Sequence, residues 1–212
     1  MLDIVHFPLF LVSVILLCIT PGPDLAYVVG QSVANGRRSG ILSAAGVATG
    51  SCLHALASAA GLTALIAASP LLFTLIKYIG AAYLIWLGGK MVWDSLRPAA
   101  TCGAAPTVSP ASARSLLLRG MITSVTNPKV LLFFIAFFPQ FVAVEGTHPA
   151  LSFLILGLVY ALIGLATDAS FALLAGGAAS AVAKNQRMRL ILDRLTGATF
   201  IGLGIRLALT RR

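Results

Sequence analysis

The chain is dominated by apolar stretches that are long enough to cross a lipid bilayer. Only 10% of its 212 residues are charged and 58% are hydrophobic, whereas a soluble domain carries charge on about a quarter of its residues. The mean hydropathy is +0.97, and the charges are bunched between apolar stretches longer than the ~18–20 residues needed to span the hydrocarbon core. The sequence therefore predicts an all-α integral membrane protein with the lipid bilayer as its environment.

Hydropathy and turn residues divide the chain into six predicted membrane-spanning helices. The first has no Lys or Arg ahead of it and no small-residue cleavage site before its break, so we expect a retained helix rather than a signal peptide. Residues 97–114 are rich in Pro, Ala, Ser and Thr and lack periodicity, which predicts a linker. We expect a single domain over residues 1–212, with halves at about 1–96 and 115–212. The spans cover about residues 5–34, 40–67, 71–96, 115–143, 150–176 and 190–209.

Two of the predicted spans are interrupted near their middle by proline. The segments are ITPGPDLAYV (19–28) in the first span and TSVTNPKVLLF (123–133) in the fourth. A proline inside a helix removes a backbone donor and costs about 3 kcal/mol. The breaks fall at corresponding places in the two halves, and residues 80–84 of the third span resemble residues 197–201 of the sixth. Because each half has three spans, the second must be inverted, which predicts a 3+3 inverted repeat with spans one and four broken near the midplane.

The two breaks form the predicted substrate site. Pro23 and Pro128 each suit the first position of a new half-helix, and Asn127 suits the N-cap of the second. Inversion points both half-helix N-termini toward a common centre, where they bring free N–H donors, one carboxylate and one ammonium. This combination is complementary to a zwitterion such as an amino acid. The predicted substrate-binding residues are Pro21, Gly22, Pro23, Asp24, Asn127, Pro128 and Lys129.

The intramembrane charges also allow structural interpretations. Asp24 and Lys129 could pair with each other, or Asp24 could cap its half-helix, but charges within a membrane tend to face cavities, which favours function. Asp168 in the fifth span is a predicted proton-coupling carboxylate, together with Asp24, because burial favours the protonated form of a carboxyl group. A hydrogen-bonded interior aspartate is the alternative for Asp168. His54 is interpreted as a packed, hydrogen-bonded side chain.

The net charge of +9 does not indicate nucleic-acid binding, because the basic residues fall in loops rather than in one patch. Ten lie on the side of the odd-numbered loops and four on the other, so the positive-inside rule places the odd-numbered loops in the cytoplasm and both termini outside. The basic C-terminal tail argues against this orientation, and a five-span topology would reverse one end. The ten are Arg37, Arg38, Lys90, Arg97, Arg114, Arg119, Lys184, Arg187, Arg189 and Arg194.

Two motifs resemble the signatures of the LysE/RhtB amino-acid exporters. TPGPD (20–24), followed by the glycines of NGRRSG (35–40) and AAGVATG (44–50), is similar to the first signature, and TNPKVLLFFIAFFPQF (126–141) is similar to the second. The resemblance covers essentially the whole chain. It implies a multi-pass protein of the bacterial inner membrane that exports amino acids or close derivatives by proton antiport. It does not fix the substrate.

The predicted site suggests a neutral or weakly polar amino acid, because it holds no charge beyond the partners of the zwitterion unless Asp168 faces it. We expect no cofactor and no resident metal, and a homodimer is compatible with the sequence. An enzyme is not expected, because no nucleophile–base constellation or metal motif is present.

The same residues bear on three other classes of transport protein. A thiol–disulfide electron carrier would need matching cysteines in spans one and four, but Cys18 has no counterpart in residues 123–129. A divalent-cation exporter using Asp24, His54 and Asp168 stays open, although these are few ligands for a transition-metal path. A passive small-solute pore also stays open.

Overall fold

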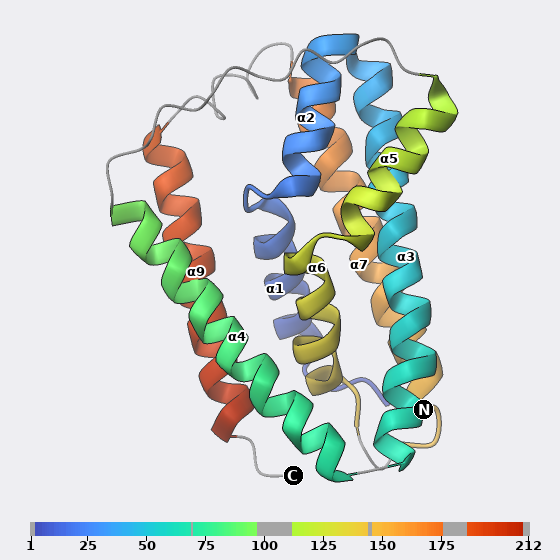
Figure 1. Cartoon of the computed structure of the whole chain (residues 1–212), viewed down its shortest axis with the longest axis vertical. Coiled ribbons are helices and arrows are strands. Elements are labelled where there is room, and N and C mark those ends of the chain that lie inside the picture. The colour runs from blue at the N-terminus through green and yellow to red at the C-terminus, as the bar shows by residue number, and fades with distance from the viewer. Residues whose placement is uncertain (1–2, 69, 97–111, 144–145, 176–185, 210–212) are drawn as a thin grey trace.

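The computed structural model describes residues 3–68, 70–96, 112–143, 146–175 and 186–209. The described residues form long helices that run roughly along one axis (Figure 1), and an isolated bridge joins Ile4 to Val142. The elements are α1 (Phe7–Ile19), α2 (Pro23–Asn35), α3 (Arg37–Ala68), α4 (Pro70–Leu96), α5 (Ala113–Val125), α6 (Pro128–Leu132), a π-helical segment η1 (Phe133–Phe137), a 3₁₀ segment η2 (Phe138–Phe141), α7 (Pro149–Leu174) and α9 (Gln186–Leu209).

Helices occupy each of the six stretches that the sequence predicts to be apolar spans. The first stretch is broken as expected, with α1 and α2 bent by 49° at the break. Two single helical stretches, 37–61 and 149–174, are long and apolar enough to cross a membrane, and the α1–α2 pair passes the same test when it is counted as one broken span. The structure therefore supports an all-α membrane protein, whereas the count of six spans stays a prediction.

The predicted linker ends earlier than the sequence suggests. Residues 113 and 114 already belong to α5, because Ser112 caps this helix by accepting a hydrogen bond from the backbone N–H of Ser115 at 3.3 Å. Such an N-cap satisfies one of the donors that a helix leaves free at its first turn. The part of the predicted linker at 97–111 lies outside the described residues.

Glycines allow the central helix α3 to approach α5 at backbone contact. A Cβ atom built on Gly46 would lie 2.3 Å from the carbonyl oxygen of Leu117, and one built on Gly120 would lie 2.5 Å from the carbonyl oxygen of Ser43. Neither clash can be relieved by turning a side chain. Small residues of this kind are the usual means by which membrane helices approach closely. This contact fixes α5, and with it the second break, against α3.

Helices α4 and α9 pack together in the same manner and form a pair at one side of the bundle (Figure 1). A Cβ atom on Gly88 would meet the carbonyl oxygen of Gly197, and a Cβ atom on Gly197 would meet that of Gly88. The pair also contacts α1 and η1. The stretches 80–84 and 197–201, whose similarity suggested a repeat, thus lie on two helices that are packed against each other.

An aromatic core anchors the second broken helix. The π-helical segment η1 and the 3₁₀ segment η2 turn several phenylalanines of the sequence FFIAFFPQF into the protein interior, where they pack on α1 and α7. Phe10 of α1, for example, lies edge-on to Phe138 and Phe141 at ring-centroid distances of 5.6 and 5.2 Å. This core positions the break that precedes η1 against the break in the first helix. Its fully buried rings are Phe10, Phe133, Phe134, Phe137, Phe138, Phe141 and Phe153.

Candidate functional site

The first break leaves a backbone carbonyl without its helical partner. In an unbroken helix the carbonyl of Leu17 would accept a hydrogen bond from the N–H of residue 21, but Pro21 has no N–H. The ammonium group of Lys129, which comes from the second break, donates instead to the carbonyl oxygens of Leu17 and Thr20, each at 3.1 Å. The two breaks therefore lie against each other, as the sequence predicts.

Gly22 makes room for this lysine. Its φ and ψ angles of −163° and −179° describe extended backbone that any residue can adopt, so conformational freedom does not explain the glycine. A Cβ atom at this position would instead lie 2.8 Å from Nζ and 3.2 Å from Cε of Lys129. The missing side chain thus allows the ammonium to reach the end of α1.

The second break is closed by side chains at both of its ends. Asn127 is the N-cap of α6, and its Oδ1 accepts a hydrogen bond from the backbone N–H of Lys129 at 3.0 Å. Pro128 cannot donate to the carbonyl of Ser124. This oxygen instead accepts a hydrogen bond from the backbone N–H of Asn127 at 3.1 Å and lies 3.2 Å from Nε2 of His54. Because a carbonyl oxygen can only accept, Nε2 carries the proton in this contact. His54 also stacks on a phenylalanine ring, which confirms its interpretation as a packed, hydrogen-bonded residue.

Two polar atoms between the breaks are buried without a hydrogen-bond partner among the described residues. They are Oδ1 of Asp24 and Nδ2 of Asn127, which make no hydrogen bond within 3.5 Å, although the two side chains lie close enough to interact with each other. The N-terminus of α2 likewise has no side-chain cap, although the first turn of a helix presents free N–H donors. Buried polar groups are normally paired, so unpaired ones call for a ligand or water. The site therefore offers a carboxylate, an amide donor and helix N–H groups to a bound molecule.

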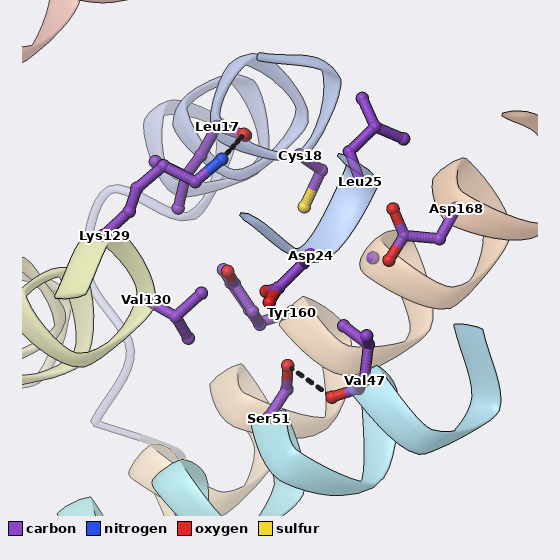
Figure 2. A pocket seen from close by; sticks show the side chains of 11 residues that line it. Leu17, Cys18, Asp24, Leu25, Val47, Ser51, Lys129, Val130, Tyr160 and Asp168 are labelled. Carbon is purple, nitrogen blue, oxygen red and sulfur yellow. Dashed lines mark hydrogen bonds between the residues drawn. The ribbon is translucent and has the colours of Figure 1, made fainter. Parts of the chain in front are cut away.

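A small cavity lies beside these groups, and Figure 2 shows the side chains that line it. Its volume is about 30 Å³, which is room for about two water molecules because one water needs roughly 10–15 Å³ on this measure. An amino acid does not fit, so the helices around the cavity must separate to admit one. The lining residues are Leu17, Cys18, Asp24, Leu25, Val47, Ser51, Lys129, Val130, Tyr160, Gly164 and Asp168.

The third intramembrane charge faces the same cavity. Asp168 on α7 is only 5% exposed and lines the cavity together with Asp24 and Lys129 (Figure 2). The sequence-based argument for a neutral cargo required Asp168 to face elsewhere, and the structure does not meet this requirement. With both carboxyl groups ionised, the cavity would carry two negative charges and one positive charge. One further proton would make it neutral.

Comparison with known proteins shows the family. Residues 15–211 match the family model described as LysE type translocator. The chain belongs to the LysE-type translocator family. It is therefore a transport protein of the membrane and not an enzyme.

Relatives of this LysE-type translocator match it over nearly the full length of both chains. A leucine efflux protein of Enterobacter sp. (strain 638) is 35% identical over 208 residues, which cover 97% of this chain and 96% of the relative. A leucine efflux protein of Klebsiella pneumoniae is 35% identical over 206 residues, covering 97% and 95%. The leucine efflux protein of Salmonella typhimurium is 32% identical over 206 residues, with the same coverage. No solved structure matches the chain.

The structure brings together three of the residues that the sequence singled out. Asp24, Lys129 and Asp168 line the cavity of this LysE-type translocator. The other predicted site residues do not line it but form the two breaks beside it; they are Pro21, Gly22, Pro23, Asn127 and Pro128.

His54 likewise lies outside the cavity lining. In the part of the chain that the structure describes, no group of three or more His, Cys, Asp or Glu side chains is placed to hold a metal ion. Asp24, His54 and Asp168, the ligands that a divalent-cation exporter would use, therefore do not form a metal-binding cluster in this part of the chain.

Several lining residues were not predicted from the sequence. Two of these, Tyr160 and Gly164, precede the predicted Asp168 at intervals of four, which places all three on one face of α7. Because Asp168 is a charged residue in a predicted span, the residues four and eight positions before it could have been predicted to line the same cavity. Cys18 lies close to the first break, but its position next to Gly164 depends on how α1 packs against α7.

Proposed function

We propose that this translocator exports neutral amino acids, leucine foremost, from the bacterial cytoplasm in exchange for protons. One observation carries the proposal: two broken helices meet at a cavity that combines an ammonium, two carboxyl groups and an apolar wall. Charges are expensive inside a membrane and mark transport pathways. The relatives named leucine efflux protein support an amino-acid cargo with an apolar side chain.

In this proposal both charged groups of the amino acid are bound at the breaks. The α-carboxylate binds to the uncapped N-terminus of α2, a position that favours anions, and to Lys129 beside it. The α-ammonium binds to Asp24, whose buried Oδ1 makes no hydrogen bond within 3.5 Å among the described residues. Asn127 supplies a further donor from Nδ2. The prolines Pro21, Pro23 and Pro128 and the small Gly22 keep the backbone open at this point.

Protons and substrate compete for the same carboxyl groups in the proposed cycle. A bound amino acid adds no net charge to the cavity, whereas a proton on Asp168 or Asp24 makes the cavity neutral. The substrate ammonium and a proton are thus alternative partners, and alternation between them couples export to proton entry. Separation of the helices around the cavity supplies the conformational change, because the cavity is too small for the cargo as it stands.

The proposal also includes the number and the orientation of the membrane spans. Six spans form a single domain over residues 1–212, with two inverted halves of three spans each, in the bacterial inner membrane. The basic loops lie in the cytoplasm and both termini lie outside. The common order of the two halves, a broken helix followed by two long helices, supports this arrangement.

Transport by the purified protein in proteoliposomes tests the proposed function. With labelled leucine on both sides of the membrane, an imposed pH gradient is expected to drive leucine against its own gradient, and a protonophore is expected to stop it. Asp168→Asn is expected to lose most of this accumulation, whereas the exposed Asp94→Asn should keep it. Leucine transport whose rate and direction do not change with the pH gradient would indicate a passive pore. Movement of lysine or arginine alone would refute the neutral cargo.

The proposed orientation predicts which loops a reagent can reach. In a background without the three native cysteines, Arg38→Cys is expected to resist a membrane-impermeant thiol reagent in intact cells and to react in inverted vesicles. Thr147→Cys is the matched control, because Thr147 is exposed near the opposite ends of the helices and should react in intact cells. The reverse pattern for the two variants would overturn the orientation.

A further inference from the structure

We propose that Gly164 of α7, facing Cys18 of α1, sets the size of the amino-acid side chain that the translocator accepts. This inference rests on the proposed amino-acid export and adds to it a position that determines specificity. Gly164 lines the cavity, and it lies one helical turn from both Asp168 and Tyr160, on the same face of α7.

Helix packing does not explain the glycine at this position. At Gly157 of the same helix, a Cβ atom would lie 2.2 Å from Cβ of Ala55, so packing of α7 against α3 requires a glycine there. A Cβ atom at Gly164 would meet only Sγ of Cys18, at 3.8 Å, which is ordinary van der Waals contact. The backbone does not need glycine either, because Gly164 lies inside a regular helix. Alanine would be the better helix former.

The space left by the missing side chain belongs to the cavity. The charged groups of an amino acid are bound at the breaks, so its side chain must point toward the remaining, apolar part of the wall. Leu25 and Val47 supply this part from α2 and α3, and Gly164 supplies it from α7. Because a methyl group is close to the size of a water molecule, one added methyl at Gly164 would take a large share of a cavity of about 30 Å³.

The test compares the transport of amino acids of different size in proteoliposomes. Gly164→Ala is expected to reach wild-type abundance but to export leucine less well relative to alanine, with the ratio of the two rates falling about 10-fold or more, since one methylene in an apolar pocket changes selectivity by about 10- to 200-fold. Cys18→Ala removes the sulfur on the facing wall, so Gly164→Ala combined with Cys18→Ala is expected to recover much of the leucine rate.

Gly30→Ala is the matched control, because a Cβ atom there meets nothing within 4 Å and Gly30 does not line the cavity. This variant should keep the wild-type ratio of leucine to alanine export. An unchanged ratio in Gly164→Ala, with wild-type leucine export intact, would overturn the inference while leaving the proposed function in place. A wild-type protein that moves no amino acid would instead refute the proposed function itself. A ratio that falls but is not recovered by Cys18→Ala would remove Cys18 from the proposal.

Discussion

Lys129→Met is expected to abolish leucine export and to lower the stability of the protein. In the structure the ammonium of Lys129 donates to the carbonyl oxygens of Leu17 and Thr20, and Leu17 has lost its helical donor to a proline. Methionine keeps the apolar stem but provides no donor. A buried acceptor left without a partner costs about 1–3 kcal/mol, so the free energy of unfolding should fall measurably. Unfolding of the purified variant in detergent and export from cells measure the two effects separately.

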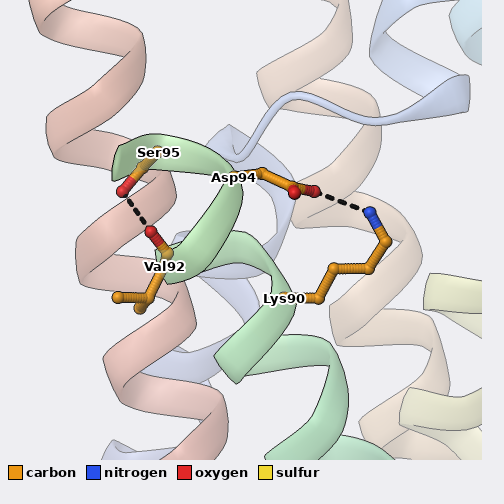
Figure 3. A network of polar contacts seen from close by, with 4 residues as sticks. All are labelled: Lys90, Val92, Asp94 and Ser95. Carbon is orange, nitrogen blue, oxygen red and sulfur yellow. Dashed lines mark hydrogen bonds and ion pairs between the residues drawn. The ribbon is translucent and has the colours of Figure 1, made fainter. Parts of the chain in front are cut away.

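Lys90→Met is the matched control for this variant. Lys90 forms an ion pair with Asp94 at 2.6 Å on the exposed side of α4 (Figure 3), and such surface pairs contribute about 0–1 kcal/mol. Its replacement should leave stability and export close to those of the wild type. If Lys129→Met were unstable but exported leucine at the wild-type rate per folded molecule, Lys129 would be a helix cap and not a substrate ligand.

Asp24→Asn is expected to remove export without lowering the amount of folded protein. Asparagine has nearly the same shape, so α2 should still begin at the same place. The buried Oδ1 of Asp24 makes no hydrogen bond within 3.5 Å among the described residues, and burying an incompletely paired carboxylate is unfavourable. Loss of the charge should therefore leave stability unchanged or raise it. Transport should fall on the order of 10- to 100-fold, because a hydrogen bond to a charged group contributes about 1.5–3 kcal/mol.

The result for Asp24→Asn depends on comparing export with abundance. Membrane abundance, measured by quantitative immunoblot, is expected to match that of the wild type. Low abundance would point to a structural role for the carboxylate, such as a partnership with Lys129. High abundance with full export would remove Asp24 from the substrate site.

The broken helices could be predicted from the sequence because proline acts locally. Pro21, Pro23 and Pro128 lack an N–H whatever surrounds them, and the structure places the breaks at these residues. The meeting of the two breaks was also expected from the sequence, since the predicted inverted repeat would bring corresponding segments together. Hydropathy located the helices to within a few residues, because each membrane-spanning helix needs apolar side chains along its own length.

The partners of the charges could not be predicted, because they depend on the approach of distant helices. The sequence placed Lys129 opposite a substrate, whereas the structure shows its ammonium on the carbonyls at the end of α1. The direction of Asp168 likewise depends on how α7 rotates against α3. The π-helical segment η1 is a further case, since it shifts which phenylalanines face the core, and such segments recur near functional sites.

Leucine counterflow in proteoliposomes is the most direct test of the claim that the two breaks form a substrate site. Vesicles with equal amounts of folded wild-type or Asp24→Asn protein are loaded with unlabelled leucine, and the entry of labelled leucine is measured without a pH gradient. The account predicts rapid entry for the wild type and at most about a tenth of that rate for Asp24→Asn, consistent with the loss of a charged hydrogen bond. Equal rates for the two proteins would contradict it.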